Sequence, residues 1–284
     1  MRLSACCACR PFARARIVSP GRYGAICFGC AIVPVLALLL GCVASPGIDE
    51  SRLVDLTYPL GDETLYWPTA APFRLEIKSA ERTPAGYWYA ANNFSTAEHV
   101  GTHLDAPYHF AQAGQKAGEI PLSRFIGPAC VLDVSQKAQA DADYRATVAD
   151  LEAWEARHGT LPEGAILLVR TGWGRYWGDR LAYFGDDTPG DASNLHFPGL
   201  SRELAELLAS ERSVDAVGID SASIDHGPST DFIVHQVLFE AGIPAFENLA
   251  SLERLPEAGA TVIALPARIE AGSGAPLRAV ALLP

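Results

Sequence analysis

The segment Glu98-His-Val-Gly-Thr-His-Leu-Asp-Ala-Pro-Tyr-His-Phe110 decides how the rest of this chain is interpreted. It holds three of the chain's seven histidines and one carboxylate: His99, His103, Asp105 and His109. Gly101, the β-branched residues on either side of it and Pro107 disfavour a helix here. In an ideal strand, His99 and Asp105 would lie roughly 20 Å apart. Both can therefore reach one ion only if the chain bends, and Gly101 permits a bend because it has no Cβ.

Imidazoles combined with a carboxylate suit Zn²⁺ and neighbouring divalent ions, and three ligands leave a coordination position open for catalysis. His109 follows Pro107 and is interpreted either as a fourth ligand or as a free imidazole that transfers a proton. Two other interpretations are a solvated loop with chance histidines and a structural metal site. A structural zinc usually includes cysteine thiolates, whereas the only nearby cysteine, Cys130, resembles a core residue.

A second group of candidates lies between Asp231 and Asn248. His235 falls within an apolar helical pattern, and Glu247 follows an apolar strand. The pattern alone favours a core histidine and a surface acid over a metal role. The segment Asp225-His-Gly-Pro228 is another candidate, but its Gly-Pro context is equally typical of a turn with polar tips.

Composition and charge exclude several functions. Hydrophobic residues make up 49% and charged residues 19% of the 284 residues, which is typical of a globular protein. The net charge is -11, and residues 1–41 carry five arginines and no acid, so the remainder carries -16. A surface this acidic repels nucleic acid and anionic lipid, so no nucleic-acid partner is expected.

The N-terminal segment is expected to be a targeting signal of the lipoprotein type. Arginines precede an apolar stretch from Tyr23 to Leu40, and Leu39-Leu-Gly-Cys42 resembles a bacterial lipobox. We expect a signal peptide at 1–41, a linker at 42–51, a single domain at 52–284 and a periplasm-facing protein anchored by lipidated Cys42. The alternatives are an uncleaved membrane anchor and a cytoplasmic protein whose true start lies downstream of Met1. The cysteine spacings of residues 6–9 and 27–30 fall in this segment, which argues against a metal or redox role.

Periodicity predicts a mixed α/β fold with many strands and few helices. Residues 57–90 are rich in Pro, Gly and aromatic residues, which indicates loops and short strands able to line a pocket. Helices are expected over Thr147–His158, Ser201–Ser210 and Asp231–Ala241. Strands are expected over Leu53–Leu56, Phe73–Ile77, Ala129–Val134, Ala165–Val169, Val214–Ile219, Ile243–Phe246, Thr261–Leu265 and Arg278–Leu282.

The histidine segment resembles the signature of the cyclase family of metal-dependent hydrolases, which includes bacterial kynurenine formamidase and isatin hydrolase. The resemblance extends from about Leu53 to Leu283. It also covers Tyr66-Trp-Pro68, Gly218–Asp225, the His235 to Glu247 pair and two segments near the end, Leu265–Arg268 and Pro276–Val280. It implies a single-domain swivelling β/β/α fold, which is commonly dimeric.

The resemblance also implies roles for individual residues. In the formamidase branch, the positions of His99, His103 and Asp105 bind one zinc, and Asp105 bridges to a second zinc held by the positions of His235 and Glu247. In the isatin hydrolase branch, one manganese uses the first cluster. The position of His109 donates and accepts protons, and that of Trp67 contacts substrate.

The expected function is therefore metal-dependent hydrolysis of a C–N amide bond in a small aromatic substrate, as in conversion of N-formylkynurenine to kynurenine and formate. Trp67 would stack on the aromatic ring of the substrate, and Trp88 is a second candidate for this contact. The alternatives are ring opening of isatin or another cyclic amide or ester, and a metal-binding envelope lipoprotein without catalysis.

Overall fold

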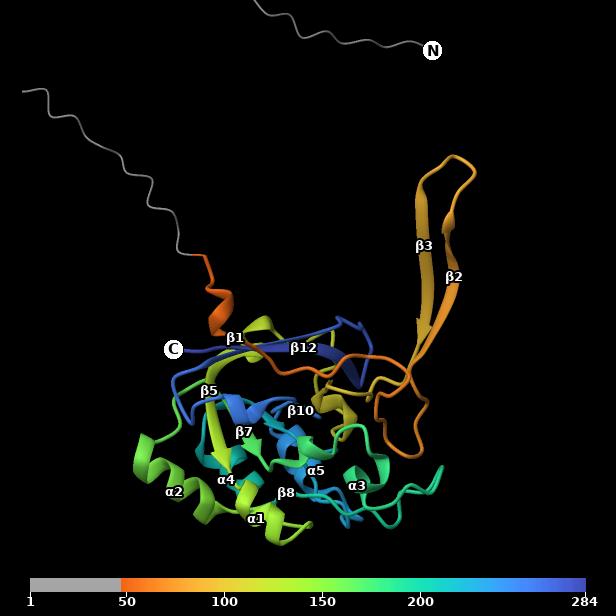
Figure 1. The fold of residues 1–284 in the computed structure, drawn as a ribbon. Coiled ribbons are helices and arrows are strands. Elements are labelled where there is room, and N and C mark those ends of the chain that lie inside the picture. Colours follow the sequence, from red (N-terminus) through yellow and green to blue (C-terminus); the bar gives the residue numbers. More distant parts are fainter. Residues whose placement is uncertain (1–46) are drawn as a thin grey trace, which may run out of the picture. The chain divides into compact units, whose positions relative to one another are not determined.

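Seven strands close into a barrel that carries the rest of the fold (Figure 1). The computed structural model describes residues 47–284, and Ile48–Pro284 form one compact unit. The order around the barrel is β12-β11-β5-β7-β9-β10-β4, and β4 pairs with β12 to close it. The bounds of these strands are β4 His103–Asp105, β5 Ile126–Asp133, β7 Ala165–Arg170, β9 Val214–Ile219, β10 Ala245–Glu247, β11 Thr261–Pro266 and β12 Gly274–Leu282.

Four of the strands, β5, β7, β9 and β10, run parallel to one another, and the pairings that close the barrel are antiparallel. The short β1, Leu53–Asp55, also pairs with β12. The parallel strand β7, with the sequence Ala-Ile-Leu-Leu-Val-Arg, is apolar almost throughout because both of its faces are covered. This mixed α/β architecture with few helices confirms the fold class expected from the sequence.

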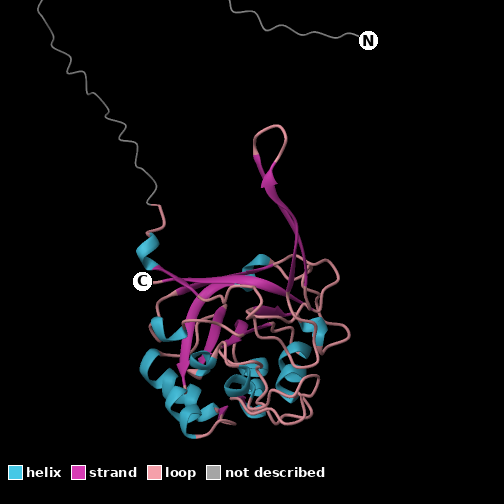
Figure 2. Cartoon of the chain, turned by 45° about the vertical axis from the view of Figure 1, so that its right-hand side comes forward, coloured by secondary structure: helices cyan, strands magenta, loops and turns pink. Residues whose placement is uncertain are grey.

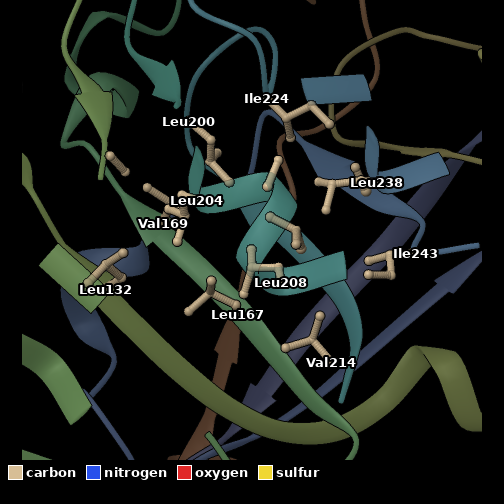
Figure 3. Close-up of a cluster of buried hydrophobic side chains, with 14 of the residues drawn as sticks. Leu132, Leu167, Val169, Leu200, Leu204, Leu208, Val214, Ile224, Leu238 and Ile243 are labelled. Carbon is tan, nitrogen blue, oxygen red and sulfur yellow. The ribbon is translucent and has the colours of Figure 1, made fainter. Parts of the chain in front are cut away.

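Alternate residues of the strands pack into two separate hydrophobic cores. Ile166 and Leu168 of β7 join a cluster with residues from all seven strands, which fills the barrel. Leu167 and Val169 face the other way and pack against the helices. Figure 3 shows this outer core, where Leu204 and Leu208 lie over the sheet.

The helices cover one side of the strands (Figure 2). Thr147 caps the second helix with a full capping box to Asp150, and Gly159 ends it with φ +85°, in agreement with the helix expected over Thr147–His158. Ser201 caps the fourth helix. The helices are α1 Ser135–Ala140, α2 Val148–His158, α3 Arg180–Phe184, α4 Arg202–Glu211 and α5 Ile233–Glu240. Short 3₁₀ turns occupy Glu50–Arg52, Pro107–His109, Leu122–Phe125, Trp173–Tyr176 and Leu252–Arg254, and β6 Arg145–Ala146 pairs with β8 Gly199–Leu200.

Two elements differ in extent from the expectation. The helix expected from Asp231 begins only at Ile233, because Phe232 adopts a left-handed conformation with φ +51°. The strand expected over Phe73–Ile77 is found but is longer. It forms β2, Arg74–Arg82, which pairs with β3, Trp88–Ser95, in a long hairpin that projects from the barrel (Figures 1 and 2).

The expected signal peptide and Cys42 lie outside the described residues. Within residues 47–284, no helix combines the length and the apolar character needed to span a bilayer.

Candidate metal centre

Gly101 bends the chain just before β4. Its φ of +54° lies in the left-handed region, and an added Cβ would lie 2.9 Å from Cγ2 of Thr64, so glycine suits this position. The bend returns His99 to the strand that carries the other two candidates. His99 Nδ1 lies 2.5 Å from Asp105 Oδ1, and His103 Nε2 lies 3.1 Å from the same oxygen.

Strand register and one helix bring in the distant candidates. Glu247, the last residue of β10, stands directly opposite His103 of β4, and its Oε2 lies 3.5 Å from His103 Nε2. From α5, His235 Nε2 approaches Asp105 Oδ2 at 3.2 Å and Glu247 Oε1 at 3.4 Å. Two groups therefore share Asp105, namely His99–His103–Asp105 and Asp105–His235–Glu247, and in each the possible ligand atoms lie within 4.8 Å of one another.

The state of His103 tests whether these residues fit a cation. In the neutral ring, Nδ1 donates a hydrogen bond to the carbonyl oxygen of Gly101 at 2.8 Å, which leaves the lone pair on Nε2 available to a cation. Among the described residues, no hydrogen-bond partner meets this buried Nε2. A buried nitrogen without a partner is costly, whereas a cation at that position would complete its coordination. The first group could therefore hold a metal ion.

The buried carboxylate of Asp225 binds the ring nitrogen of His235 that faces away from Asp105. Oδ2 of Asp225 accepts the hydrogen of His235 Nδ1 at 2.7 Å, and the same carboxylate accepts the backbone N–H groups of Val234 and His235 at 3.1 Å. These bonds join Asp225 to the first turn of α5 and turn Nε2 of His235 toward Asp105. The sequence presented Asp225 either as a candidate site residue or as part of a turn, and this supporting role was not predicted.

Ser273 orients His99 in a similar way. Nε2 of His99 lies 3.0 Å from Oγ of Ser273, which donates to Oε2 of Glu98 at 2.7 Å. The backbone N–H of Ser273 donates to the same carboxylate at 2.9 Å. Gly274 leaves room for this arrangement, because a Cβ there would lie 2.5 Å from Cε1 of His99. No sequence signal links Ser273 to His99 across 174 residues.

The electrostatics of the centre favour a cation. Burial opposes charge on His103, but the negative charges of Asp105 and Glu247 outweigh it and raise the pKa of His103 to about 9. Burial likewise opposes charge on His235, whose pKa is nevertheless raised well above its usual value by hydrogen bonds to Asp105, Asp225 and Glu247. Burial and the charge of Asp105 raise the pKa of Glu247. The carboxylates thus favour positive charge in the centre. A divalent ion can supply that charge in place of the protons on His103 and His235.

His109 lies beside the possible ligands without joining either group. Its ring stacks on that of His99 with 4.0 Å between centroids, and it lies 6.0 Å from the ring of His235. The surrounding protein removes water from His109 and lowers its pKa to about 4, while Asp105 opposes this shift. His109 is therefore uncharged at neutral pH and able to accept a proton.

A cavity of about 260 Å³ opens over the centre. All seven residues singled out from the sequence line it, including Trp67, whose ring meets those of Phe197 and Phe232 edge-on with centroids 6.3 Å apart. Trp88, the other tryptophan expected to contact an aromatic ring, does not line this cavity, and its side chain is 62% exposed on the projecting hairpin. The apolar wall of the cavity consists mainly of Leu65, Tyr66, Trp67, Phe110, Phe184 and Phe232.

Comparison with known proteins agrees with this geometry. The family described as "Putative cyclase" matches residues 54–226. An isatin hydrolase of Roseibium aggregatum is 33% identical over 249 residues, covering 83% of this chain and 93% of the relative. A kynurenine formamidase of Bacillus cytotoxicus is 27% identical over 232 residues, covering 81% and 97%. The solved structure of isatin hydrolase A from Ralstonia solanacearum superimposes with a TM-score of 0.75 at 35% identity, covering 82% of this chain and 92% of that one. The chain therefore belongs to the cyclase family of metal-dependent hydrolases.

Proposed function

We propose that this protein hydrolyses a C–N amide bond in a small aromatic substrate, and that the first substrate to test is an isatin-like cyclic amide. The observation that carries the proposal is the convergence of His99, His103 and Asp105 at the base of an aromatic-walled cavity, with His109 beside them. The relatives named isatin hydrolase, which share the larger identity with this chain, support the choice of a cyclic amide.

The donor set supports Zn²⁺ or Mn²⁺ as the bound ion, since imidazole nitrogens and a carboxylate suit both metals. His99, His103 and Asp105 would hold it, and His235 with Glu247 would extend the site to a second ion through Asp105. When bound, the ion supplies the Lewis acidity that makes a carbonyl carbon more electrophilic.

The protein's own side chains account for binding and proton transfer. The walls around Trp67 and Phe232 would hold an aromatic ring and exclude bulk water. In amide hydrolysis, oxygen from water adds to the carbonyl carbon, and the electron pair of the C–N bond leaves on nitrogen, which then needs a proton. His109 can take a proton from the attacking water and pass it to that nitrogen. His103 and His235 are held in orientation by the hydrogen bonds that they donate to the Gly101 carbonyl and the Asp225 carboxylate.

An arylformamide such as N-formylkynurenine is the second candidate substrate. The formamidase relatives support it, and so does the second group of possible ligands, Asp105, His235 and Glu247. A linear formamide and a cyclic amide present the same reacting bond, so the walls of the cavity, and not the metal ligands, would decide between them.

The test is turnover of isatin and N-formylkynurenine by the purified full-length chain, first stripped of metal with a chelator and then supplied with Zn²⁺ or Mn²⁺. We expect hydrolysis of at least one substrate only with metal, and a fall in kcat of about 100-fold or more in His109→Ala. His196→Ala is the control, because that histidine is exposed and pairs with Asp143. Tight metal binding without turnover of either compound would favour the non-catalytic metal-binding protein, and full activity in His109→Ala would reject the proton-transfer role.

A further inference from the structure

Asn248 stands directly after Glu247, the last residue of β10, in an unusual backbone conformation. Its φ of +54° lies in the left-handed region, which asparagine tolerates better than most residues but which still costs free energy relative to glycine. The residue is only 6% exposed and lines the cavity over the candidate metal centre. Residues strained in this way persist where the surrounding structure holds them, and they cluster at functional sites. The contacts of the Asn248 side chain therefore bear on how the centre is built.

Both ends of the Asn248 amide are hydrogen-bonded. Nδ2 donates to the carbonyl oxygen of Gly101 at 2.9 Å, and Oδ1 accepts from the hydroxyl of Tyr183 at 2.8 Å. The chemistry of the partners fixes which end is which, because a carbonyl oxygen can only accept and must therefore face the amide nitrogen. Tyr183 is itself fully buried, which restricts the position of its hydroxyl. The amide is therefore held between these two groups in a single orientation.

The Gly101 carbonyl is the contact that Asn248 shares with a candidate ligand. Its oxygen can accept two hydrogen bonds, and it takes one from Nδ1 of His103 at 2.8 Å and one from Nδ2 of Asn248. Gly101 is the residue that bends the chain before β4, and a glycine backbone is the least restricted of all. A second donor on its carbonyl therefore restrains the peptide group that orients the imidazole of His103.

Backbone hydrogen bonds join Asn248 to the ends of both neighbouring strands. Its carbonyl oxygen accepts from Oγ1 of Thr102 at 2.7 Å, just before β4, so the two segments exchange hydrogen bonds in both directions. Its backbone N–H donates to the carbonyl oxygen of Ser221 at 3.0 Å, just after β9. The Asn248 amide therefore reaches Gly101 from a backbone that is anchored on two sides.

We propose that Asn248 is a positioning residue of the metal centre, which holds the Gly101 carbonyl so that His103 keeps its hydrogen on Nδ1 and presents Nε2 to the ion. The inference rests on the proposed function, since it takes His103 as a ligand. The contacts run from Tyr183 through Asn248 and Gly101 to His103, and none of them is longer than 2.9 Å. Outer contacts of this kind fix the tautomer and the ring orientation of a ligand histidine.

The test compares glycine substitutions at two left-handed positions of the full-length chain in a mild detergent. Asn248→Gly removes the amide and relieves the backbone strain. Ser251→Gly relieves the same kind of strain where φ is +57°, at a residue that is not among those lining the cavity. The measurements are the Kd for Zn²⁺, by competition with a chromophoric chelator, and the visible absorption spectrum of the Co²⁺-loaded chain, which reports ligand geometry. We expect the Kd to rise about tenfold and the Co²⁺ bands to change in Asn248→Gly, with little change in Ser251→Gly.

A second pair of variants separates positioning from stability. Tyr183→Phe removes the hydroxyl that orients Asn248, and Tyr144→Phe removes a hydroxyl that donates to Asp150 at the start of α2. Both should lower the free energy of unfolding measured in urea, because each leaves a hydrogen-bond acceptor without its donor. Only Tyr183→Phe should also raise the Kd for Zn²⁺ and change the Co²⁺ spectrum.

Two results would overturn the positioning role alone. The first is a loss of stability in Asn248→Gly and Tyr183→Phe with an unchanged Kd and spectrum, which would make both residues structural. The second is an unchanged Kd with a raised KM for whichever substrate is hydrolysed, which would make Asn248 a substrate contact. A wild-type chain without affinity for Zn²⁺ is a different outcome, because it would overturn the proposed function and this inference with it.

Discussion

At the scale of single residues, the centre depends on how each histidine is held as much as on which residues are present. His103 is oriented by the carbonyl of Gly101, His235 by the carboxylate of Asp225, and His99 by Ser273. Each contact occupies one ring nitrogen and leaves the other directed at the acids. Such outer contacts fix the tautomer of a ligand histidine and raise its basicity.

Asp225→Asn should therefore weaken metal binding by about 10–100-fold. The amide keeps the shape of the carboxylate but loses the negative charge that polarises the imidazole of His235. The measurement is competition for Zn²⁺ against a chromophoric chelator. Asp231→Asn is the control, because Asp231 accepts from the Ile233 N–H at the same helix start without touching a candidate ligand. Unchanged affinity in Asp225→Asn would show that His235 is not a ligand or needs no support.

At the scale of elements, the start of α2 shows how contacts between residues close together in the sequence stabilise the folded state. The Asp150 carboxylate accepts hydrogen bonds from the hydroxyl of Tyr144 and from the backbone and side chain of Thr147, and it pairs with Lys137. Burial raises the pKa of Asp150, but these contacts outweigh burial and hold it below its usual value. A carboxyl with a depressed pKa stabilises the folded state only while it is ionised.

The stabilisation by Asp150 should therefore be fully present above pH ~4, where the unfolded chain also ionises, and should disappear as the pH falls through the lower folded pKa. Asp150→Asn should cost about 1 kcal/mol at neutral pH and progressively less in acid. Urea unfolding of wild type and variant across this range measures the difference. Glu152→Gln, exposed in the same helix, should show little change at any pH. A difference that stays constant into acid would contradict the assignment.

At the scale of the whole molecule, barrel closure assembles the centre. The strand β4 lies between β10 and β12, so Glu247 faces His103 on one side while Gly274 pairs with Asp105 on the other. Loops next to the barrel supply the aromatic wall of the cavity. A change that loosened the pairing of β4 with either neighbour would therefore disturb ligands that lie more than a hundred residues apart in the chain.

Attachment to the cell envelope also belongs to this scale. We propose that Cys42 is lipidated after cleavage and holds the domain at the membrane. The Cys42→Ser variant, expressed in a bacterium, should lose incorporation of labelled palmitate and should no longer be processed at residue 42. Mass spectrometry of the mature N-terminus measures both effects. An unprocessed or unlipidated wild-type chain would contradict the proposal and favour an uncleaved anchor or a downstream start.

The sequence alone was sufficient for features that short-range rules govern. The histidine segment identified three possible ligands, because a glycine bend and a dense set of imidazoles are local properties. The helices expected from Thr147 and Ser201 begin directly after these residues, and a cap of this kind acts within one turn. The unbroken apolar run Ala165–Val169 indicated a strand, as found for β7.

Only the tertiary structure decided how distant segments meet. The pattern favoured a core role for His235 and a surface role for Glu247, yet the register of β10 on β4 places Glu247 opposite His103, and helix α5 brings His235 to Asp105. The pairings of Asp225 with His235 and of Ser273 with His99 could not be predicted from the sequence either. The position of Glu247 depends on strand register, where a shift of one residue sends every side chain to the opposite face. Register is fixed by packing of the whole barrel, so no local stretch of sequence encodes it.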